Sequence, residues 1–352
     1  MQLEPFCAIC PADAAAAGRL AKLDWPGSSK ADDLRQRLRD LSSQGALRTS
    51  DGPALLAYRV RRVGHRDAWG LIGSVAACEY ADGMLAHEQT LEKTVRIRTE
   101  YLADTGLQTG PVLLAGADEA THDAIQLAKG AVGDVSPLIE LQDAERSDTL
   151  WVLDGAAATS VQALLAKAEE PLIADGHHRA KATASCCKSM LVALFADKDF
   201  SVGACERVVS LVVDRDGLAE RIAEGGLVTR ASDGVAGPRL AQLWDASQWH
   251  SILLGDADNL TSDARLLQDR VLEPFLDISD PARDERLFCL PACKTTADAA
   301  GLAGPRDVVF RIAPTGIGPV RDMASHGILM PPKTTWFEPK PLPGIVVRDF
   351  RS

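Results

Sequence analysis

The sequence lacks three features that would place it in a broad class at once. It has no run of about 18 apolar residues, so we expect no membrane-spanning helix. The N-terminus has no basic segment and Asp13 interrupts its apolar stretch, so we predict no signal peptide and a cytoplasmic location. Positive charge is also scarce, because 38 Lys and Arg residues face 49 Asp and Glu residues. The resulting net charge of −11 argues against binding to nucleic acid or to a membrane surface.

Cysteine is sparse as well, with eight residues in a chain of 352. Without an export signal, these side chains are expected to be reduced thiols. Cys7 and Cys10 form a Cys-x-x-Cys pair, and Cys289 and Cys293 form a second pair further along the chain. A zinc site would require both pairs to meet. The first pair lies in an apolar segment, where small buried thiols are common, so we predict no zinc or other metal site at these cysteines.

The composition is that of a soluble globular protein, with 46% hydrophobic and 25% charged residues. Strand-like and helix-like segments alternate, which indicates an α/β (α+β) fold with a mixed sheet and surrounding helices. We predict a single large domain over residues 1–352, with a core at 55–230. The remaining part, 231–352, is expected to end in a tail that packs back on the core.

Hydrophobic periodicity and turn residues give the expected elements. A strand and an Ala-rich helix should precede a helix that begins at a capping box, Ser29 to Asp32, and ends at Gly45. The later strands are expected at 55–63, 69–77, 111–115, 148–153, 172–174, 190–195, 208–213, 287–290 and 308–312. The later helices are expected at 87–100, 121–129, 216–225, 238–244 and 262–276, with one more that Ser160 caps.

The chain is organised around residues 171–181, Pro-Leu-Ile-Ala-Asp-Gly-His-His-Arg-Ala-Lys. A short apolar strand leads into Gly176, and helix formers follow, so the segment reads as strand, turn and helix start. A helix N-terminus favours anions, and Gly176 lets a ligand approach the backbone closely. Arg179 is suited to a phosphate or carboxylate, and Asp175 to a base or a Mg²⁺ ligand. The alternative is a solvated turn with a capping Asp.

Two further segments offer charged residues. His87 and Glu88 are expected near a helix start, where Glu88 beside cations is suited to a general base, although a simple dipole interaction would also explain it. In the tail, 329–341, Trp336 and Phe337 favour burial, which would fix Lys333 and Lys340. We expect deletion of the residues after Leu329 to abolish activity while leaving the fold measurable.

Several motifs occur together and in one order. They are Gly70-Leu71-Ile72-Gly73, His87-Glu88-x-Thr90, Lys93-x-x-Arg96, Leu150-Trp151, the segment Ile173 to Arg179 and the Pro-rich tail. Their joint order resembles the bacterial and archaeal proteins of the domain of unknown function 1015, over roughly residues 55–345. Asp148 and Glu206 depart from the family pattern, in which His is usual at the first position and common before Arg207.

The turn is also similar to that of the ParB/sulfiredoxin-like superfamily, including its free-serine kinases. This resemblance implies a phosphate-binding core and phosphoryl transfer between a nucleotide and a hydroxyl amino acid such as serine, with Mg²⁺ and ATP or ADP. It assigns catalysis to Glu88, Asp175 and His178. The implied phosphate or nucleotide ligands are Gly176, His177, Arg179, His87, Thr90, Lys93, Arg96, Arg207, Lys333 and Lys340.

Two other functions fit the same residues. A nucleotide-binding regulatory switch would keep the phosphate turn but tolerate the loss of Glu88. A hydrolase or metal-dependent enzyme would use the His pair as ligands. There is no Gly-Lys-Ser/Thr phosphate loop and no His-Arg-Asp loop, which excludes the major kinase classes. The expected partners are a nucleotide and a small-molecule substrate, and a homodimer is one expected assembly.

Overall fold

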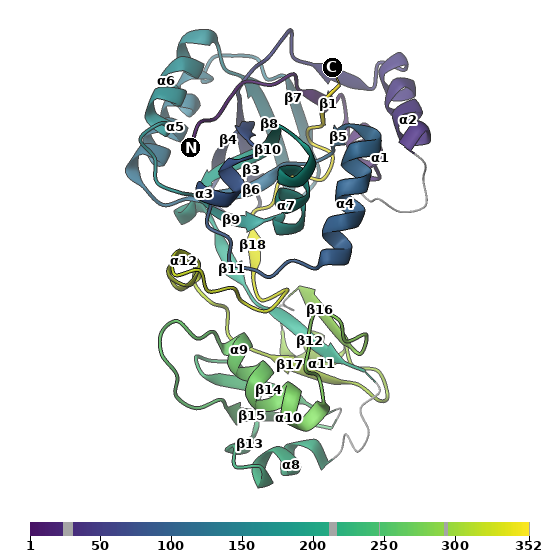
Figure 1. Ribbon diagram of the computed structural model, residues 1–352, viewed down its shortest axis with the longest axis vertical. Helices are drawn as coiled ribbons and strands as arrows, with labels where there is room; N and C mark the ends of the chain where they lie inside the picture. Colours follow the sequence, from purple (N-terminus) through teal and green to yellow (C-terminus); the bar gives the residue numbers. More distant parts are fainter. Residues whose placement is uncertain (24–30, 211–216, 246, 292–294, 352) are drawn as a thin grey trace. The chain divides into compact units, whose positions relative to one another are not determined.

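A computed structural model describes residues 1–23, 31–210, 217–245, 247–291 and 295–351. Its contacts divide the chain into two compact units (Figure 1). Unit 1 comprises Met1–Ala86, Thr90–Phe200 and Pro339–Ser352, and unit 2 comprises His87–Gln89 and Ser201–Glu338. The chain enters the larger part of unit 2 at Ser201, earlier than the internal boundary that we expected at residue 230. That the two units form a single domain stays a prediction.

Unit 1 is built on a seven-stranded sheet in the order β7-β8-β3-β4-β10-β6-β9. Only β10 and β6 run parallel, and the other neighbours are antiparallel. The strands are β3 (Leu56–Arg62), β4 (Ala68–Ala76), β6 (Val112–Gly116), β7 (Ile139–Gln142), β8 (Arg146–Val152), β9 (Leu172–Asp175) and β10 (Ser189–Ala196). The predicted mixed sheet with surrounding helices is confirmed.

Helices and short strand pairs complete unit 1. The helices are α1 (Ala14–Ala21), α2 (Ala31–Ser43), α3 (Glu79–Asp82), α4 (Glu92–Thr105), α5 (Glu119–Ala131), α6 (Gly155–Leu165) and α7 (His177–Cys186). The short pairs are β1 (Ile9–Pro11) with β2 (Leu47–Thr49), and β5 (Leu107–Gln108) with β19 (Arg348–Asp349). The predicted capping box at Ser29 lies outside the described residues.

One predicted helix start is wrong. Helix α6 begins at Gly155, and the side chain of Asp154 caps it by accepting a hydrogen bond from Ala157 N at 2.7 Å. Ser160 lies inside the helix, where its hydroxyl donates to Ala156 O at 2.9 Å. Asp154 takes the capping position because its carboxylate can satisfy an N–H group that the first turn leaves without a helical partner.

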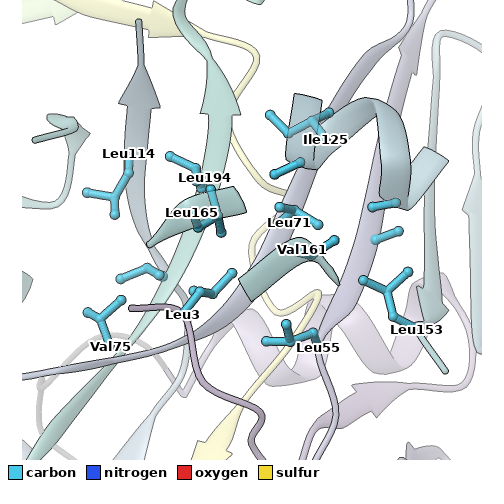
Figure 2. Close-up of a cluster of buried hydrophobic side chains, with 14 of the residues drawn as sticks. Leu3, Leu55, Leu71, Val75, Leu114, Ile125, Leu153, Val161, Leu165 and Leu194 are labelled. Atoms are coloured by element: carbon cyan, nitrogen blue, oxygen red, sulfur yellow. The ribbon is translucent and has the colours of Figure 1, made fainter. Parts of the chain in front are cut away.

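The core of unit 1 lies between the sheet and helices α5 and α6. Figure 2 shows Leu71, Leu114 and Leu194 of neighbouring strands beside Val161 and Leu165 of α6. All five side chains are fully buried. At roughly 25 cal/mol per Å² of apolar area, such burial is the main force that holds the strand ends in place.

Unit 2 has a six-stranded antiparallel sheet in the order β13-β15-β14-β17-β12-β16 and a short pair, β11 with β18. The strands are β11 (Ser201–Gly203), β12 (Cys205–Val209), β13 (Thr229–Ser232), β14 (Leu240–Trp244), β15 (Trp249–Leu253), β16 (Leu287–Pro291), β17 (Val308–Arg311) and β18 (Trp336–Glu338). The helical elements are α8 (Leu218–Glu224), α9 (Asp263–Leu267), a π-helical segment (Gln268–Leu272), α10 (Glu273–Leu276), α11 (Thr296–Ala300) and α12 (Ile317–Ser325). None of the described helices in either unit is long and apolar enough to span a bilayer.

The helix predicted at 238–244 is wrong, because Leu240–Trp244 forms strand β14. This strand pairs with β15 on one side and β17 on the other, and Ala241 and Leu243 are fully buried. Pairing on both edges satisfies the backbone of a segment that is too short to form a stable helix alone.

The tail contributes to both units. In unit 2, β18 pairs with β11, and Phe337 is 1% exposed. In unit 1, Val346 and Val347 are fully buried, and β19 pairs with β5. Deleting everything after Leu329 would therefore remove core side chains from each unit. These contacts argue against our expectation that the fold survives this truncation, and a point substitution in the tail is the cleaner test.

Candidate phosphate-binding site

The turn after β9 has the backbone geometry that the sequence indicated. Gly176 has a φ of 97°, in the left-handed region that glycine adopts at little cost. A Cβ atom added at Gly176 would lie 3.5 Å from Arg179 Nη1 and 3.6 Å from Val112 Cα. Glycine thus permits both the sharp turn from β9 into α7 and the close approach of the Arg179 side chain.

Helix α7 presents its positive end at this turn. Its first backbone hydrogen bond runs from Ala180 N to Gly176 O at 2.8 Å. The N–H groups of the three residues before Ala180 therefore lie outside the helical ladder of α7, as at the start of any helix. A helix N-terminus stabilises negative charge, so this end of α7 can bind an anion.

Arg179 is held beside the turn. Its Nη1 donates to the carbonyl oxygen of Pro111 at 2.6 Å, just before strand β6. A Cβ added at Gly110 would lie 3.8 Å from the guanidinium, so glycine also leaves space on that side. The sequence predicted Arg179 as a phosphate ligand, and the structure places its guanidinium next to the backbone of Gly176.

The tail brings a second cation to the turn. Lys340 Nζ forms an ion pair with Asp175 Oδ1, and their side chains are 27% and 40% exposed. Arg146 Nη2 donates to Lys340 O at 2.6 Å, which fixes the backbone of the lysine. Asp175, Arg179 and Lys340 are thus gathered at one turn within unit 1.

A buried polar network supports this arrangement, and the sequence analysis did not anticipate it. Arg146 donates from Nε and Nη2 to Asp148 at 2.6 and 2.7 Å, and the Tyr58 hydroxyl also donates to Asp148. Leu342 N donates to the Tyr58 hydroxyl at 3.1 Å. Burial, reinforced by Asp148, raises the pKa of Tyr58 well above its ordinary value, so the hydroxyl keeps its proton. The network ties residues 340–342 to strands β3 and β8.

The remaining predicted ligands of unit 1 have structural contacts. His177 is 4% exposed. His178 Nε2 accepts a hydrogen bond from Leu91 N at 2.8 Å, just before α4 begins, and Lys181 Nζ donates to Thr90 Oγ1 at 3.2 Å. An imidazole nitrogen that accepts this bond caps α4, which is a structural role. A catalytic role for His178 stays a prediction.

Helix α4 holds two of the predicted phosphate ligands. Lys93 is exposed. Arg96 Nε lies 3.9 Å from Glu100 Oε1, and the side chain of Arg96 is 71% exposed. Exposed pairs of this kind contribute little to stability. The structure gives Lys93 and Arg96 solvent-facing positions, and their binding roles stay predictions.

The segment His87–Gln89 belongs to unit 2. Met330 N donates to His87 O at 2.8 Å, Gln89 N donates to Met330 O at 3.3 Å, and His87 Nε2 lies 3.0 Å from Thr335 Oγ1. Helix α4 begins at Glu92, later than the start at residue 87 that we predicted, so His87 and Glu88 lie before the helix rather than in its first turn. They pair with an extended segment of the tail instead.

Two predicted cationic ligands also lie in unit 2. Arg207 is 3% exposed on β12, directly opposite Cys289 of β16. Lys333 has a φ of 59°, which is uncommon for a residue with a side chain. Burial raises the pKa of Cys205 to about 11 and also raises the pKa of Cys289. The positive charges of Arg207 and Lys333 act to lower both pKa values, and the negative charge of Glu88 acts to raise them. The prediction that Glu88 and Asp175 share one site is not tested by these contacts and stays a prediction.

A comparison with protein families identifies the chain. The family described as "Protein of unknown function (DUF1015)" matches residues 20–261, which is more than half of the sequence. The chain belongs to the DUF1015 family. No curated protein matches it.

Solved structures are similar to this DUF1015 protein at low identity. SbnI with a C-terminal truncation, from Staphylococcus aureus, is 12% identical with a TM-score of 0.46, and the match covers 77% of this chain and 85% of that one. A mutant free serine kinase in complex with ADP is 15% identical with a TM-score of 0.44, over 76% and 87% of the two chains. A conserved hypothetical protein from Pyrococcus furiosus is 18% identical with a TM-score of 0.45, over 80% and 96%.

One motif that suggested the DUF1015 family, and one position that departs from the family pattern, have structural roles here. A Cβ added at Gly73 would lie 2.6 Å from Leu3 Cγ, and one added at Gly70 would lie 2.7 Å from Leu194 O. These glycines let β4 pack closely against its neighbours. Asp148, which stands where the family usually has His, is the 2% exposed centre of the Tyr58 and Arg146 network.

Proposed function

We propose that this DUF1015 protein transfers a phosphoryl group between a nucleotide and the hydroxyl of a small amino acid. The observation that carries the proposal is the turn from β9 into α7. There a left-handed Gly176, the N-terminus of α7 and Arg179 lie at one turn, and Lys340 pairs with the carboxylate of Asp175. Phosphoryl transfer depends mainly on positioning and charge neutralisation, and these groups supply both.

Each group has a role in this proposal. The N-terminal end of α7 binds the phosphate oxygens, and Arg179 and Lys340 balance the charge that develops during transfer. Asp175 is an oxygen donor of the type that Mg²⁺ prefers, and Mg²⁺ bound with the nucleotide would neutralise phosphate charge. Lys340 then exchanges its contact with Asp175 for one with a phosphate oxygen.

The proposed transfer is a displacement at the phosphorus atom. The acceptor hydroxyl loses its proton to a carboxylate, Asp175 or Glu88, and its oxygen forms the new bond to phosphorus. The bond between that phosphorus and the leaving phosphate oxygen breaks, and its electron pair stays on the nucleotide. The reverse reaction returns the phosphoryl group to the nucleotide.

Serine is the leading acceptor, and ATP or ADP the leading nucleotide. This choice rests on the similarity of the Asp-Gly-His-His-Arg turn to that of free-serine kinases, so it is an analogy from the motif. The geometry of the turn supports the wider class of ligand, which is an anionic phosphate group.

A nucleotide-binding regulatory switch is the second candidate. Two observations favour it: Asp175 is ion-paired with Lys340, and His178 accepts a hydrogen bond from Leu91 N just before α4. Polar groups that are engaged in this way can bind a nucleotide without catalysing transfer. The switch and the enzyme differ in one measurable property, which is turnover.

The deciding experiment follows phosphorus by ³¹P NMR. The purified protein is incubated with Mg²⁺ and either ATP plus serine or ADP plus phosphoserine. We expect a phosphoserine or nucleotide signal that changes with time in at least one direction. Nucleotide binding by calorimetry without any transfer would favour the switch and remove the enzyme proposal.

A further inference from the structure

Arg207 lacks a partner that its position requires. Its side chain is 3% exposed, and Nη1 donates to Cys205 O at a long 3.3 Å. Nη2 is closed off from solvent and has no hydrogen-bond partner in the part of the chain that the structure describes. Buried guanidinium groups are normally paired and fully hydrogen-bonded, because removing the charge from water is costly. The missing partner is expected to be an anion.

The neighbours of Arg207 within unit 2 leave a net positive charge, because one carboxylate, Glu88, stands against two cations. Cys205 and Arg207 are two residues apart on β12, so their side chains lie on the same face of the sheet. Cys289 pairs with Arg207 from β16 and lies on that face as well. Both thiols are neutral at physiological pH, because burial raises their pKa values. The adjacent acid, Glu206, is directed to Arg311, whose Nε lies 3.3 Å from its carboxylate.

Lys333 adds a second cation to the same region. Its positive charge, like that of Arg207, acts to lower the pKa values of both Cys205 and Cys289. Its φ of 59° costs roughly 1 kcal/mol for a residue with a side chain. A lysine with this backbone conformation carries a cost in stability, and such conformations are concentrated at binding sites.

We propose that Arg207 and Lys333 form a carboxylate-binding subsite that holds the acceptor amino acid. This inference rests on the proposed function, in which the acceptor carries both a hydroxyl and a carboxylate. A guanidinium matches a carboxylate with two parallel hydrogen bonds, and a lysine beside it adds a point charge. The phosphates are assigned to the Gly176 turn, so the two anionic groups of the reactants have separate cationic partners.

Calorimetry with two matched compounds tests the assignment. L-serine carries the carboxylate, and ethanolamine is the same molecule without it. We expect L-serine to bind the wild-type protein and ethanolamine to bind at least about tenfold more weakly, since hydrogen bonds to charged groups are strong. Arg207→Met should weaken L-serine binding by about tenfold to hundredfold and leave ADP binding unchanged. Equal affinity for the two compounds in the wild type would overturn the proposal.

Variants of each cation show which ligand depends on which unit. Arg179→Gln should weaken ADP binding and leave L-serine binding unchanged, the opposite of Arg207→Met. Loss of ADP binding in Arg207→Met with L-serine unaffected would reassign Arg207 to a phosphate and overturn the proposal. L-serine binding that depends on Arg207, found without any phosphoryl transfer, would remove the proposed reaction while leaving the subsite standing.

A stability measurement keeps the test valid if Arg207→Met folds poorly. Removing a buried charge without a full set of partners should raise the melting temperature of the ligand-free protein, because methionine has similar bulk and no desolvation cost. Lys333→Gln is the second variant, and it should also weaken L-serine binding. A lower melting temperature for Arg207→Met, with L-serine binding unchanged in Lys333→Gln, would show that the two cations are structural.

Discussion

The cations of the two units have different surroundings. In unit 1, Lys340 is paired with Asp175, Arg146 with Asp148, and Arg179 with the Pro111 carbonyl. In unit 2, Arg207 is almost fully buried, yet its Nη2 has no partner among the described residues. We therefore propose different roles for these groups. The cations at the turn of unit 1 would position a phosphate, and Arg207 would recognise the acceptor.

Removing a carboxylate should have the largest effect. We expect Asp175→Asn or Glu88→Gln to slow phosphoryl transfer by roughly 10² to 10⁴, the contribution of a well-placed general base. The variant with the larger loss identifies which unit carries the base. Asp269→Asn is a matched control, because Asp269 is also ion-paired and its side chain is 40% exposed, like that of Asp175. Unchanged transfer in both Asp175→Asn and Glu88→Gln would remove both carboxylates from the mechanism.

The second effect concerns Arg179. We expect Arg179→Gln to reduce turnover by about 10² to 10³, as for other groups that stabilise developing charge. Arg239→Gln is the control, since Arg239 Nη1 donates to Thr261 O at 2.6 Å, the same length as the bond from Arg179 to Pro111. Steady-state kinetics and the melting temperature should be measured together. If both variants lose the same activity, Arg179 acts only through folding.

Replacing Lys340 should lower turnover much more than it lowers the stability of the protein. Lys340→Met removes a partly exposed ion pair with Asp175, and such pairs contribute about 0–1 kcal/mol to the free energy of unfolding. Loss of a charged hydrogen bond to phosphate should reduce turnover by roughly tenfold to hundredfold. Urea unfolding and transfer kinetics on the same sample give both values. A large loss of stability with little loss of turnover would assign Lys340 to the scaffold.

The sequence predicted best what depends on neighbouring residues. The strand, the turn at Gly176 and the helix start at 172–186 are local, and all three are present. The Tyr58, Asp148 and Arg146 network joins two strands that meet only in the folded sheet, so no local pattern revealed it. The helix predicted at 238–244 is strand β14, because a segment of five residues is too short for its hydrophobic pattern to distinguish a helix from a strand. Tertiary pairing decides such segments.

The smallest effect on turnover is expected from Tyr58→Phe, which removes one hydroxyl from the network. Asp148 loses a donor and Leu342 N loses an acceptor, which should lower the free energy of unfolding by about 1–3 kcal/mol. Phosphoryl transfer at saturating substrate should stay close to that of the wild type. A fall in turnover as large as that of Lys340→Met would show that the network sets the position of Lys340 during catalysis.

The division of unit 1 along the chain also sets the order in which a ribosome can complete it. The segment Ser201–Glu338 separates Phe200 from Pro339, and its synthesis takes on the order of 10 s at about 5–20 residues per second. Until then, unit 1 lacks the buried side chains of Val346 and Val347, and Asp175 lacks Lys340. All seven strands of the unit 1 sheet are synthesised before the first strand of the unit 2 sheet, so we expect the sheet of unit 1 to form first and its tail contacts to form last. The phosphate turn, encoded in the middle of the sequence, receives its last charged residue only as synthesis ends.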